Sequence, residues 1–281
     1  MGPRFRGDDS KGSDGPVQRA AEAQKSTTVL HRTRHIPMAG TLSVVAGLLL
    51  WEFVSRVLVA NALFLAAPTQ IIAAVIALAK SGELWRHVGI SGIEFALGYA
   101  IASVLGVLAG FAMARSIVAK NAMAPWVSGL YATPTIALAP LFILWFGIGI
   151  WSKVLIVILL VFFPVAINTE AGLRTTSERL IEMLRSFGAN ERQIFFKVSL
   201  PSAVPFILAG LKLGIGRGLI GVVVAELFGS RAGLGRLISA SADAFNMPDL
   251  FAGVVVLAVA GIAMTSGFSW LERKLVPWTK D

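Results

Sequence analysis

The chain has 281 residues, of which 56% are hydrophobic and only 15% are charged, with a formal net charge of +9. Because about a quarter of the residues are charged in an ordinary soluble domain, this composition argues against a soluble fold and favours an all-α membrane protein. No cysteine is present, which excludes disulfides, thiolate metal sites and iron–sulfur clusters, and three histidines are too few to favour a metal site. No cofactor is therefore expected.

The N-terminal segment, residues 1–38, is predicted to be a disordered tail, because Gly, Ser, Asp, Lys and Arg dominate it and no apolar period occurs there. Residues 39–281 form the predicted transmembrane domain, with six apolar spans and a polar loop at residues 169–202. The expected spans are Thr41–Val59, Val88–Ala114, Met123–Phe146, Lys153–Asn168, Ala203–Phe228 and Leu250–Trp270.

Two segments between the spans and one proline-rich span have features of their own. Ile71–Leu78 is too short to cross a membrane, so it is predicted to be a helix that lies on the outer membrane surface or packs against the bundle. Residues 229–249 contain Gly, Ser and Asp and are predicted to form a loop. The third span contains Pro125, Pro134 and Pro140, and kinks are expected in it. Pro134 and Pro140 either open this helix near a solute path or merely bend it.

Small residues recur at four-residue spacing in the second and fifth spans. In lipid, such residues let helix backbones approach closely, so both spans are predicted to be tightly packed. The residues concerned are Gly98, Ala102, Gly106, Gly110, Gly210, Gly214 and Gly218.

The basic residues are distributed unequally between the two sides of a six-span arrangement. Seventeen Lys and Arg residues fall on the side that holds both chain ends and residues 169–202, and six fall on the other side. Because basic segments are retained in the cytoplasm, both termini and the loop are predicted to be cytoplasmic. The same distribution explains the basic net charge without nucleic acid, and no nucleic-acid partner is expected.

The polar loop contains signals for a first short amphipathic helix. Thr175 and Glu178 have the spacing of a capping box, in which two side chains satisfy the free N–H groups at a helix start. Leu180, Leu184 and Phe187 then fall on one face of the helix that follows.

A second short helix is predicted after a sharp turn. Gly188 suits the left-handed conformation that ends many helices, and Asn190 can cap the segment Glu191–Val198, which Pro201 is predicted to end. Helix physics alone leaves two interpretations of this pair of helices. They lie on the membrane surface, or they dock onto a partner protein.

The spacing within this loop is specific. Glu182-Met183-Leu184 is followed after three residues by Gly188 and, after nine more, by Val198-Ser199-Leu200-Pro201. This pattern resembles the cytoplasmic signature of bacterial ABC importer permeases, which reads Glu-Ala-Ala, three residues, Gly, nine residues, Ile, one residue, Leu-Pro. The glutamate, the glycine, the Leu-Pro pair and all spacings match. Met183, Leu184 and Val198 depart from the family pattern.

Most of the chain after residue 40 resembles the permease subfamily for aliphatic sulfonates, taurine, nitrate and thiamine precursors. The supporting stretches are Pro68-Thr69, Pro140-Leu141 through Trp145-Phe146-Gly147, Phe163-Pro164, Ala225-Glu226, Gly233-Leu234-Gly235 and Phe251-Ala252-Gly253. The resemblance implies a type I importer bundle of six helices in the bacterial inner membrane. It also implies partners: two ATPase subunits, a periplasmic or lipid-anchored solute-binding protein and a second permease subunit, expected to form a homodimer.

The resemblance implies that the ATPase subunits drive alternating access and that the solute is small and anionic, of the sulfonate, nitrate or taurine kind. Leu184 and Phe187 would anchor the loop in the ATPase, and Glu182 and Arg185 would pair at its rim. The full set that the resemblance assigns to ATPase coupling is Glu182, Leu184, Arg185, Phe187, Gly188, Leu200 and Pro201.

The chain itself is not expected to be an enzyme. It has no G-x-x-x-x-G-K-[ST] loop to cradle a nucleotide phosphate and no nucleophile–base pair, so no catalytic residue is assigned and ATP hydrolysis belongs to the partner subunit. The alternative function is a secondary transporter that needs no ATPase. That alternative predicts inverted repeats and more spans, and neither is clear in the sequence.

Charged residues inside the spans are candidates for the translocation path, because a charge is costly in lipid and usually faces protein or water. The candidates are Glu94, Lys212 and Arg217, together with Pro134. Lys212 and Arg217 either attract an anion, or one of them pairs with Glu94 across helices or extends to the membrane surface. Glu94 departs from many relatives, which carry a basic residue near this point. Glu226 is predicted to make a structural hydrogen bond rather than to contact the solute.

Overall fold

The structure is a computed structural model that describes residues 37–59, 61 and 63–276. The described residues form helices and turns and contain no strand, which confirms the all-α class. The chain divides into two compact units, residues 1–50 and 51–281, and the division falls inside helix α2. The predicted tail, residues 1–38, lies outside the described residues except for its last two positions, where α2 begins.

The helices follow one another with short connections. Among the described elements, η1 and η3 are short π-helical segments and η2 is a short 3-10 helix. The elements are α2 (Pro37–Phe53), η1 (Val54–Val59), α3 (Pro68–Lys80), α4 (Glu83–Arg115), α5 (Ile117–Ala132), η2 (Thr135–Leu138), α6 (Ala139–Phe146), α7 (Ile150–Arg174), α8 (Glu178–Ser186), α9 (Glu191–Ile194), η3 (Phe195–Ser199), α10 (Leu200–Gly229), α11 (Leu234–Asp243) and α12 (Met247–Leu275).

Five helices are long and apolar enough to cross a membrane, and a bent pair supplies a sixth candidate span. The five are Gly40–Val59, Glu83–Arg115, Ile150–Arg174, Glu191–Gly229 and Met247–Leu275, and the bent pair is Ile117–Ala132 with Thr135–Phe146. These spans correspond in order to the six that the sequence predicts, so the six-span membrane fold class is confirmed.

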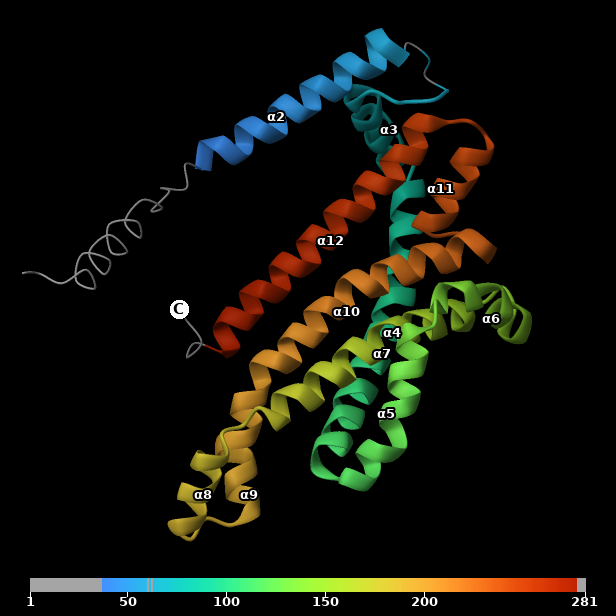
Figure 1. Cartoon of the computed structure of the whole chain (residues 1–281). Coiled ribbons are helices and arrows are strands. Elements are labelled where there is room, and N and C mark those ends of the chain that lie inside the picture. Colours follow the sequence, from blue (N-terminus) through green and yellow to red (C-terminus); the bar gives the residue numbers. More distant parts are fainter. Residues whose placement is uncertain (1–36, 60, 62, 277–281) are drawn as a thin grey trace, which may run out of the picture. The chain divides into compact units, whose positions relative to one another are not determined.

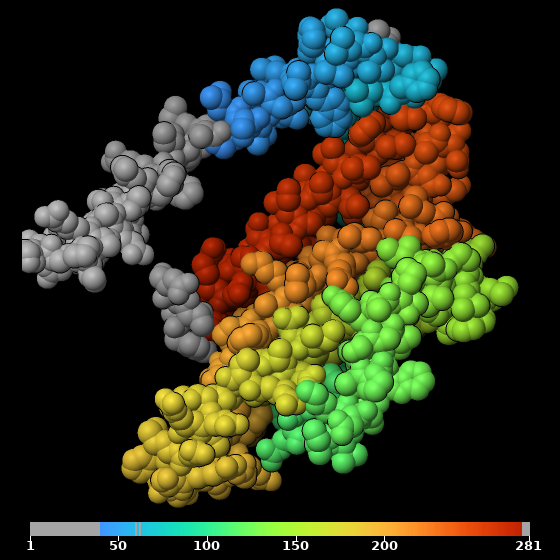
Figure 2. Space-filling model, in the orientation of Figure 1, coloured from blue at the N-terminus to red at the C-terminus, as the bar shows by residue number. Residues whose placement is uncertain are grey.

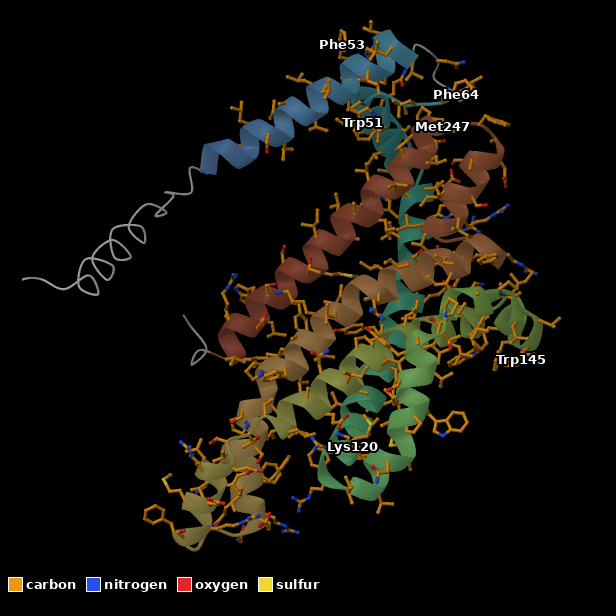
Figure 3. All side chains as sticks on the ribbon, in the orientation of Figure 1. Trp51, Phe53, Phe64, Lys120, Trp145 and Met247 are labelled. Carbon is orange, nitrogen blue, oxygen red and sulfur yellow. The ribbon has the colours of Figure 1, made fainter. Side chains whose placement is uncertain are left out.

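The third span is broken, with a bend of 84° between α5 and the segment that contains η2 and α6. The break lies at Thr133 and Pro134, where ψ of Pro134 is 78°, outside the helical region. Proline lacks an N–H and disfavours helix in the residue before it, which explains the position of the break. Pro140 lies in the first turn of α6, where a missing N–H is tolerated. Trp145, labelled in Figure 3, lies on α6 and is 64% exposed.

Helix α7 packs along α4 and α10, and these three helices form the centre of the bundle (Figure 1). Glycines on α4 allow this approach. A Cβ added at Gly98 would lie 2.6 Å from Cβ of Val157, and one added at Gly106 would lie 2.8 Å from Cβ of Val165. The predicted packing role of these glycines is therefore confirmed. The buried side chains of this core are Phe95, Ala102, Val157, Val161, Val165, Ile215 and Val222.

A second core joins α3, α11 and α12. Helix α3 buries Ile71 and Leu78 in a cluster that also contains Leu234 and Leu237 of α11, so the prediction that this short segment packs against the bundle is confirmed. The prediction that residues 229–249 are a loop is wrong, since they contain α11. Leu234 and Leu237 are the large apolar side chains that α11 buries. The surrounding Ser, Gly and Asp residues obscure the helical period in the sequence.

The packing of α4 on α7 yields a test with two glycines of the same helix. Gly106→Ala is expected to lower the free energy of unfolding by about 1–3 kcal/mol, because its methyl group overlaps Val165. Gly92→Ala is expected to raise it by up to about 1 kcal/mol, because no heavy atom lies within 4 Å of its added Cβ and alanine favours helix. Thermal unfolding of the full chain in detergent measures both. A shift in the same direction for the two variants would contradict this packing.

Candidate functional site

Residues 178–199 form a helical hairpin, called here the coupling hairpin, that precedes α10. Figure 2 shows it in yellow as a lobe at one end of the bundle. Gly188 has a φ of +79° and ends α8 as predicted. The Gly188 N–H donates to the Arg185 carbonyl at 2.9 Å and the Ala189 N–H donates to the Leu184 carbonyl at 3.0 Å. These two bonds are those of a Schellman motif, which closes a helix through a left-handed residue.

The second half of the coupling hairpin is capped and tied to the first. The Asn190 side chain accepts from the Gln193 N–H at 2.9 Å, and the Gln193 side chain accepts from the Asn190 N–H at 2.9 Å. The predicted capping role of Asn190 is confirmed. Arg185 of α8 forms an ion pair with Glu191 of α9 at 3.0 Å. The hairpin is therefore held by its own turn, cap and ion pair.

The predicted capping box at Thr175 and Glu178 is wrong. Helix α7 extends to Arg174, so Thr175 is its C-cap and its hydroxyl donates to the Gly172 carbonyl at 2.9 Å. The N-cap of α8 is Ser177, which makes no side-chain capping bond. The apolar run of the fourth span gave no signal for this extra length, because its last turns are polar.

The prediction that Pro201 ends the second helix is also wrong. The chain runs from α9 through η3 into α10 and forms one span of 39 residues, Glu191–Gly229. The Leu200 N–H bonds to the Phe195 carbonyl, five residues earlier, in a π-helical turn. This wider turn changes the register of the bonds just before Pro201, so the helix continues past the missing proline N–H.

The exposed apolar face of the coupling hairpin is formed by Leu180, Met183 and Phe187, whose exposed fractions are 45%, 49% and 81%. Leu184, predicted to be an anchor, is half-buried. Met183 departs from the family pattern, but its spacing from Leu180 and Phe187 places it on the same helix face. No residue of α8 is buried, so the described part of the chain leaves much of this face exposed.

The remaining residues assigned to coupling lie in two places. Glu182 is exposed on α8 and forms no ion pair with the described residues, whereas Arg185 is engaged with Glu191. Leu200 and Pro201 are half-buried at the start of α10. Phe195, in η3 next to them, packs edge to face on Phe111 of α4, with ring centroids 5.0 Å apart. The hairpin is thus joined to both α10 and α4.

Buried charges lie toward the opposite end of α10. Glu94 of α4, Lys153 of α7 and Glu226 of α10 are each 3% exposed or less. Glu94 faces both Glu226 and Lys153. The Lys153 ammonium also donates to the Gly149 carbonyl at 2.9 Å. The fourth span is predicted to begin at Lys153, but the sequence does not indicate that this side chain lies near Glu94 and Glu226, because that proximity arises from packing.

Glu226 attaches the segment after α10 to α4. The Ser91 hydroxyl of α4 donates to one Glu226 oxygen at 2.5 Å, and the Gly235 N–H donates to the other at 2.6 Å. Ser91 also accepts from the Leu234 N–H at 2.8 Å. The predicted structural hydrogen bonding of Glu226 is confirmed. A Cβ added at Gly235 would lie 2.8 Å from Cβ of Glu226, so glycine is needed for this approach.

Neither basic residue in the middle of α10 pairs with Glu94, so that alternative is wrong. Lys212 forms an ion pair with Glu272 of α12 at 3.4 Å. Arg217 donates to the Tyr131 hydroxyl oxygen at 2.7 Å, and its guanidinium lies 4.7 Å from the centroid of the same ring. Pro134, the fourth candidate for the path, is exposed at the break in the third span. Tyr131 carried no sequence signal, because its contact with Arg217 depends on how the broken helix packs.

The contacts of Ser91 predict a stabilising role that can be measured. Ser91→Ala removes a donor to Glu226 and leaves the buried Leu234 N–H without its acceptor, so the free energy of unfolding should fall by about 1–3 kcal/mol. Ser269→Ala is the control, since its hydroxyl only adds a bond to the Thr265 carbonyl of its own helix. Its effect should stay within about 0.5 kcal/mol. Equal thermal stability of the two variants in detergent would contradict this role.

Residues 102–281 match the family model described as binding-protein-dependent transport system inner membrane component. The formylaminopyrimidine transport permease protein ThiX of Halalkalibacterium halodurans is 34% identical, over 85% of this chain and 95% of its own. The putative aliphatic sulfonates transport permease protein SsuC of Bacillus subtilis is 36% identical, over 88% of this chain and 90% of its own.

The fold also has counterparts among solved structures. The MetNI methionine ABC transporter in inward-facing conformations superposes with a TM-score of 0.54 and 20% sequence identity. The match covers 69% of this chain and 94% of the solved one. At this identity the likeness concerns the arrangement of the helices.

Proposed function

The chain belongs to the family of binding-protein-dependent transport system inner membrane components, and on this premise we propose that separate ATPase subunits drive it through the coupling hairpin. It is an ABC importer permease of the sulfonate and taurine type, a multi-pass membrane protein and not an enzyme. We propose that it imports a small anionic solute by alternating access, as a homodimer supplied by a solute-binding protein. Both termini are then cytoplasmic.

One observation carries the proposed ATPase contact: the hairpin presents an apolar face that the described chain leaves largely exposed. Phe187, with 81% of its surface exposed, stands at the tip beside the Schellman turn. Large aromatic side chains that enter a pocket of a partner commonly dominate binding energy. Glu182, exposed and without an ion-pair partner in the described residues, is suited to a polar contact at the rim.

The connection of the hairpin to the bundle supports the transmission of movement. The hairpin continues into α10 as one span, so a displacement at α9 moves α10 with it. The contact of Phe195 with Phe111 gives a second connection, to α4. A stiff element that joins a nucleotide-driven partner to packed helices is what a rigid-body switch between inward-facing and outward-facing states requires.

The distribution of basic residues supports a cytoplasmic location for the coupling hairpin. The end of α7 and the segment between α7 and α10 together carry five basic residues between positions 174 and 197. Basic segments flanking membrane spans are retained on the cytoplasmic side, where an ATPase would meet them. A secondary transporter, the alternative function, needs neither an ATPase nor an exposed apolar hairpin.

The left-handed turn provides the direct test of ATPase coupling. In Gly188→Val, a β-branched residue is placed at a φ of +79°, which costs about 1–2 kcal/mol, although no heavy atom lies within 4 Å of the added Cβ. The turn between α8 and α9 should then change, and co-purification of the ATPase subunit of the same transport system should fall about fivefold or more. The measurement is pull-down of the tagged permease from membranes, with ATP-dependent uptake in parallel.

The matched control is Gly188→Asn. Asparagine adopts the left-handed conformation far more readily than valine, so ATPase association and uptake should stay close to those of the unsubstituted chain. Uptake that persists with no ATPase bound would instead support a secondary transporter.

Phe187 provides a second test that does not disturb the backbone. Phe187→Ala removes an exposed ring, so the thermal stability of the permease should not change, whereas affinity for the ATPase should fall by about 2 kcal/mol or more. Val118→Ala, at a residue that is 74% exposed near the start of α5, is the control and should leave affinity unchanged. Equal affinities for the two variants would argue that the hairpin face does not enter the ATPase.

A further inference from the structure

Two basic residues, Lys212 and Arg217, lie in the middle of α10, more than ten residues from either end of this helix. A buried or membrane-embedded charge needs compensation from protein, water or a ligand. The charge of Lys212 is compensated by its ion pair with Glu272. Arg217 forms no ion pair with a carboxylate among the described residues. Its positive charge is therefore available to a ligand.

Tyr131 fixes the position of the Arg217 guanidinium. Its hydroxyl oxygen accepts an N–H of Arg217 at 2.7 Å, and the guanidinium carbon lies 4.7 Å from the centroid of the tyrosine ring. The same ring packs edge to face on Phe163, with ring centroids 6.2 Å apart. A guanidinium has five N–H donors and no acceptor, and a tyrosine oxygen that accepts from it still carries its own O–H donor. The pair thus offers several donors and a positive charge, which is the set that anionic oxygens bind.

The place of the pair in the fold suits a solute path. Tyr131 lies three residues before Pro134, at the break in the third span. Interrupted membrane helices commonly form solute sites, because their polar backbone must face water or protein rather than lipid. On α10, Leu213 and Ile220 share the face of Arg217 and are 57% and 55% exposed, so the described chain leaves this face uncovered.

We propose that Arg217, held by Tyr131, is an anion-binding subsite of the translocation path. The proposal rests on the proposed permease function and deepens it, since it names the side chains that bind the anionic group of the solute. Lys212, which is neutralised by Glu272, is excluded from this role.

The absence of cysteine from the chain makes a single-cysteine test possible. Ile220→Cys places a thiol three residues from Arg217, on the same helix face about 5–6 Å away. In membrane vesicles that contain the full chain, the thiol is treated with two methanethiosulfonates, one with an anionic sulfonatoethyl group and one with a cationic trimethylammonioethyl group. The ratio of the anionic to the cationic rate, normalised to that of free 2-mercaptoethanol, should exceed one.

Three further variants in the Ile220→Cys chain test the cause. Arg217→Gln should lower the rate ratio about tenfold, the order expected for one unit charge a few ångströms from the thiol in a water-filled path. Arg217→Lys keeps the charge and should retain most of the preference. Lys212→Gln removes a positive charge eight residues from position 220, about 12 Å along the helix, and should therefore change the ratio much less than Arg217→Gln does.

Two results would overturn the proposal. The first is a thiol at position 220 that reacts with neither reagent, which would place the face in lipid. The second is a normalised ratio of anionic to cationic rates near one when Arg217 is present. This measurement is informative even if the Arg217→Gln variant fails to fold. The proposed function is tested separately by association with the ATPase, so an importer that couples normally but lacks anion preference at position 220 would disprove the subsite alone.

Discussion

Close contact between helix backbones on the two sides of α7 is the interaction on which the described bundle depends. Lipid chains are as apolar as leucine, so helices in a membrane gain little from burying apolar surface and associate through van der Waals packing. Gly98 and Gly106 leave so little room that an added Cβ would overlap Val157 and Val165. An interface of this kind holds helices together tightly, and small sliding along it is one form of movement that the proposed alternating access would use.

The two ends of α10 are held in different ways, and the difference suits a moving part. At one end, Glu226 accepts hydrogen bonds from Ser91 and Gly235, which attach the start of α11 to α4 through buried polar contacts. At the other end, the coupling hairpin is tied mainly to itself, and Phe195 makes its aromatic contact with α4. Buried hydrogen bonds are costly to break, whereas aromatic contacts can shift with less loss. The hairpin end is therefore the end that the proposed ATPase contact would displace.

Most features with a local determinant follow from the sequence, apart from the capping box expected at Thr175 and Glu178, whereas features with a tertiary determinant do not. The six spans, the left-handed turn at Gly188 and the cap at Asn190 follow from apolar runs and from single-residue preferences. The continuation of the helix past Pro201 was missed because a π-helical turn accommodates the proline, and no residue pattern announces such a turn. The partners of Lys212 and Arg217 were equally hidden, since Glu272 and Tyr131 are 60 and 86 residues away in sequence.

The proposed ATPase contact and the proposed anion-binding subsite involve a single continuous helix. Arg217 lies 23 residues after Ile194 in the same 39-residue span, a separation of about 35 Å at the rise of an α-helix. A displacement of the hairpin therefore reaches Arg217 through a continuous backbone, whereas Tyr131 belongs to a different, broken span. Movement of α10 relative to α5 would alter the contact between the guanidinium and the ring. The strength with which an anion is held would then depend on the state of the ATPase, which is the coupling that directional transport needs.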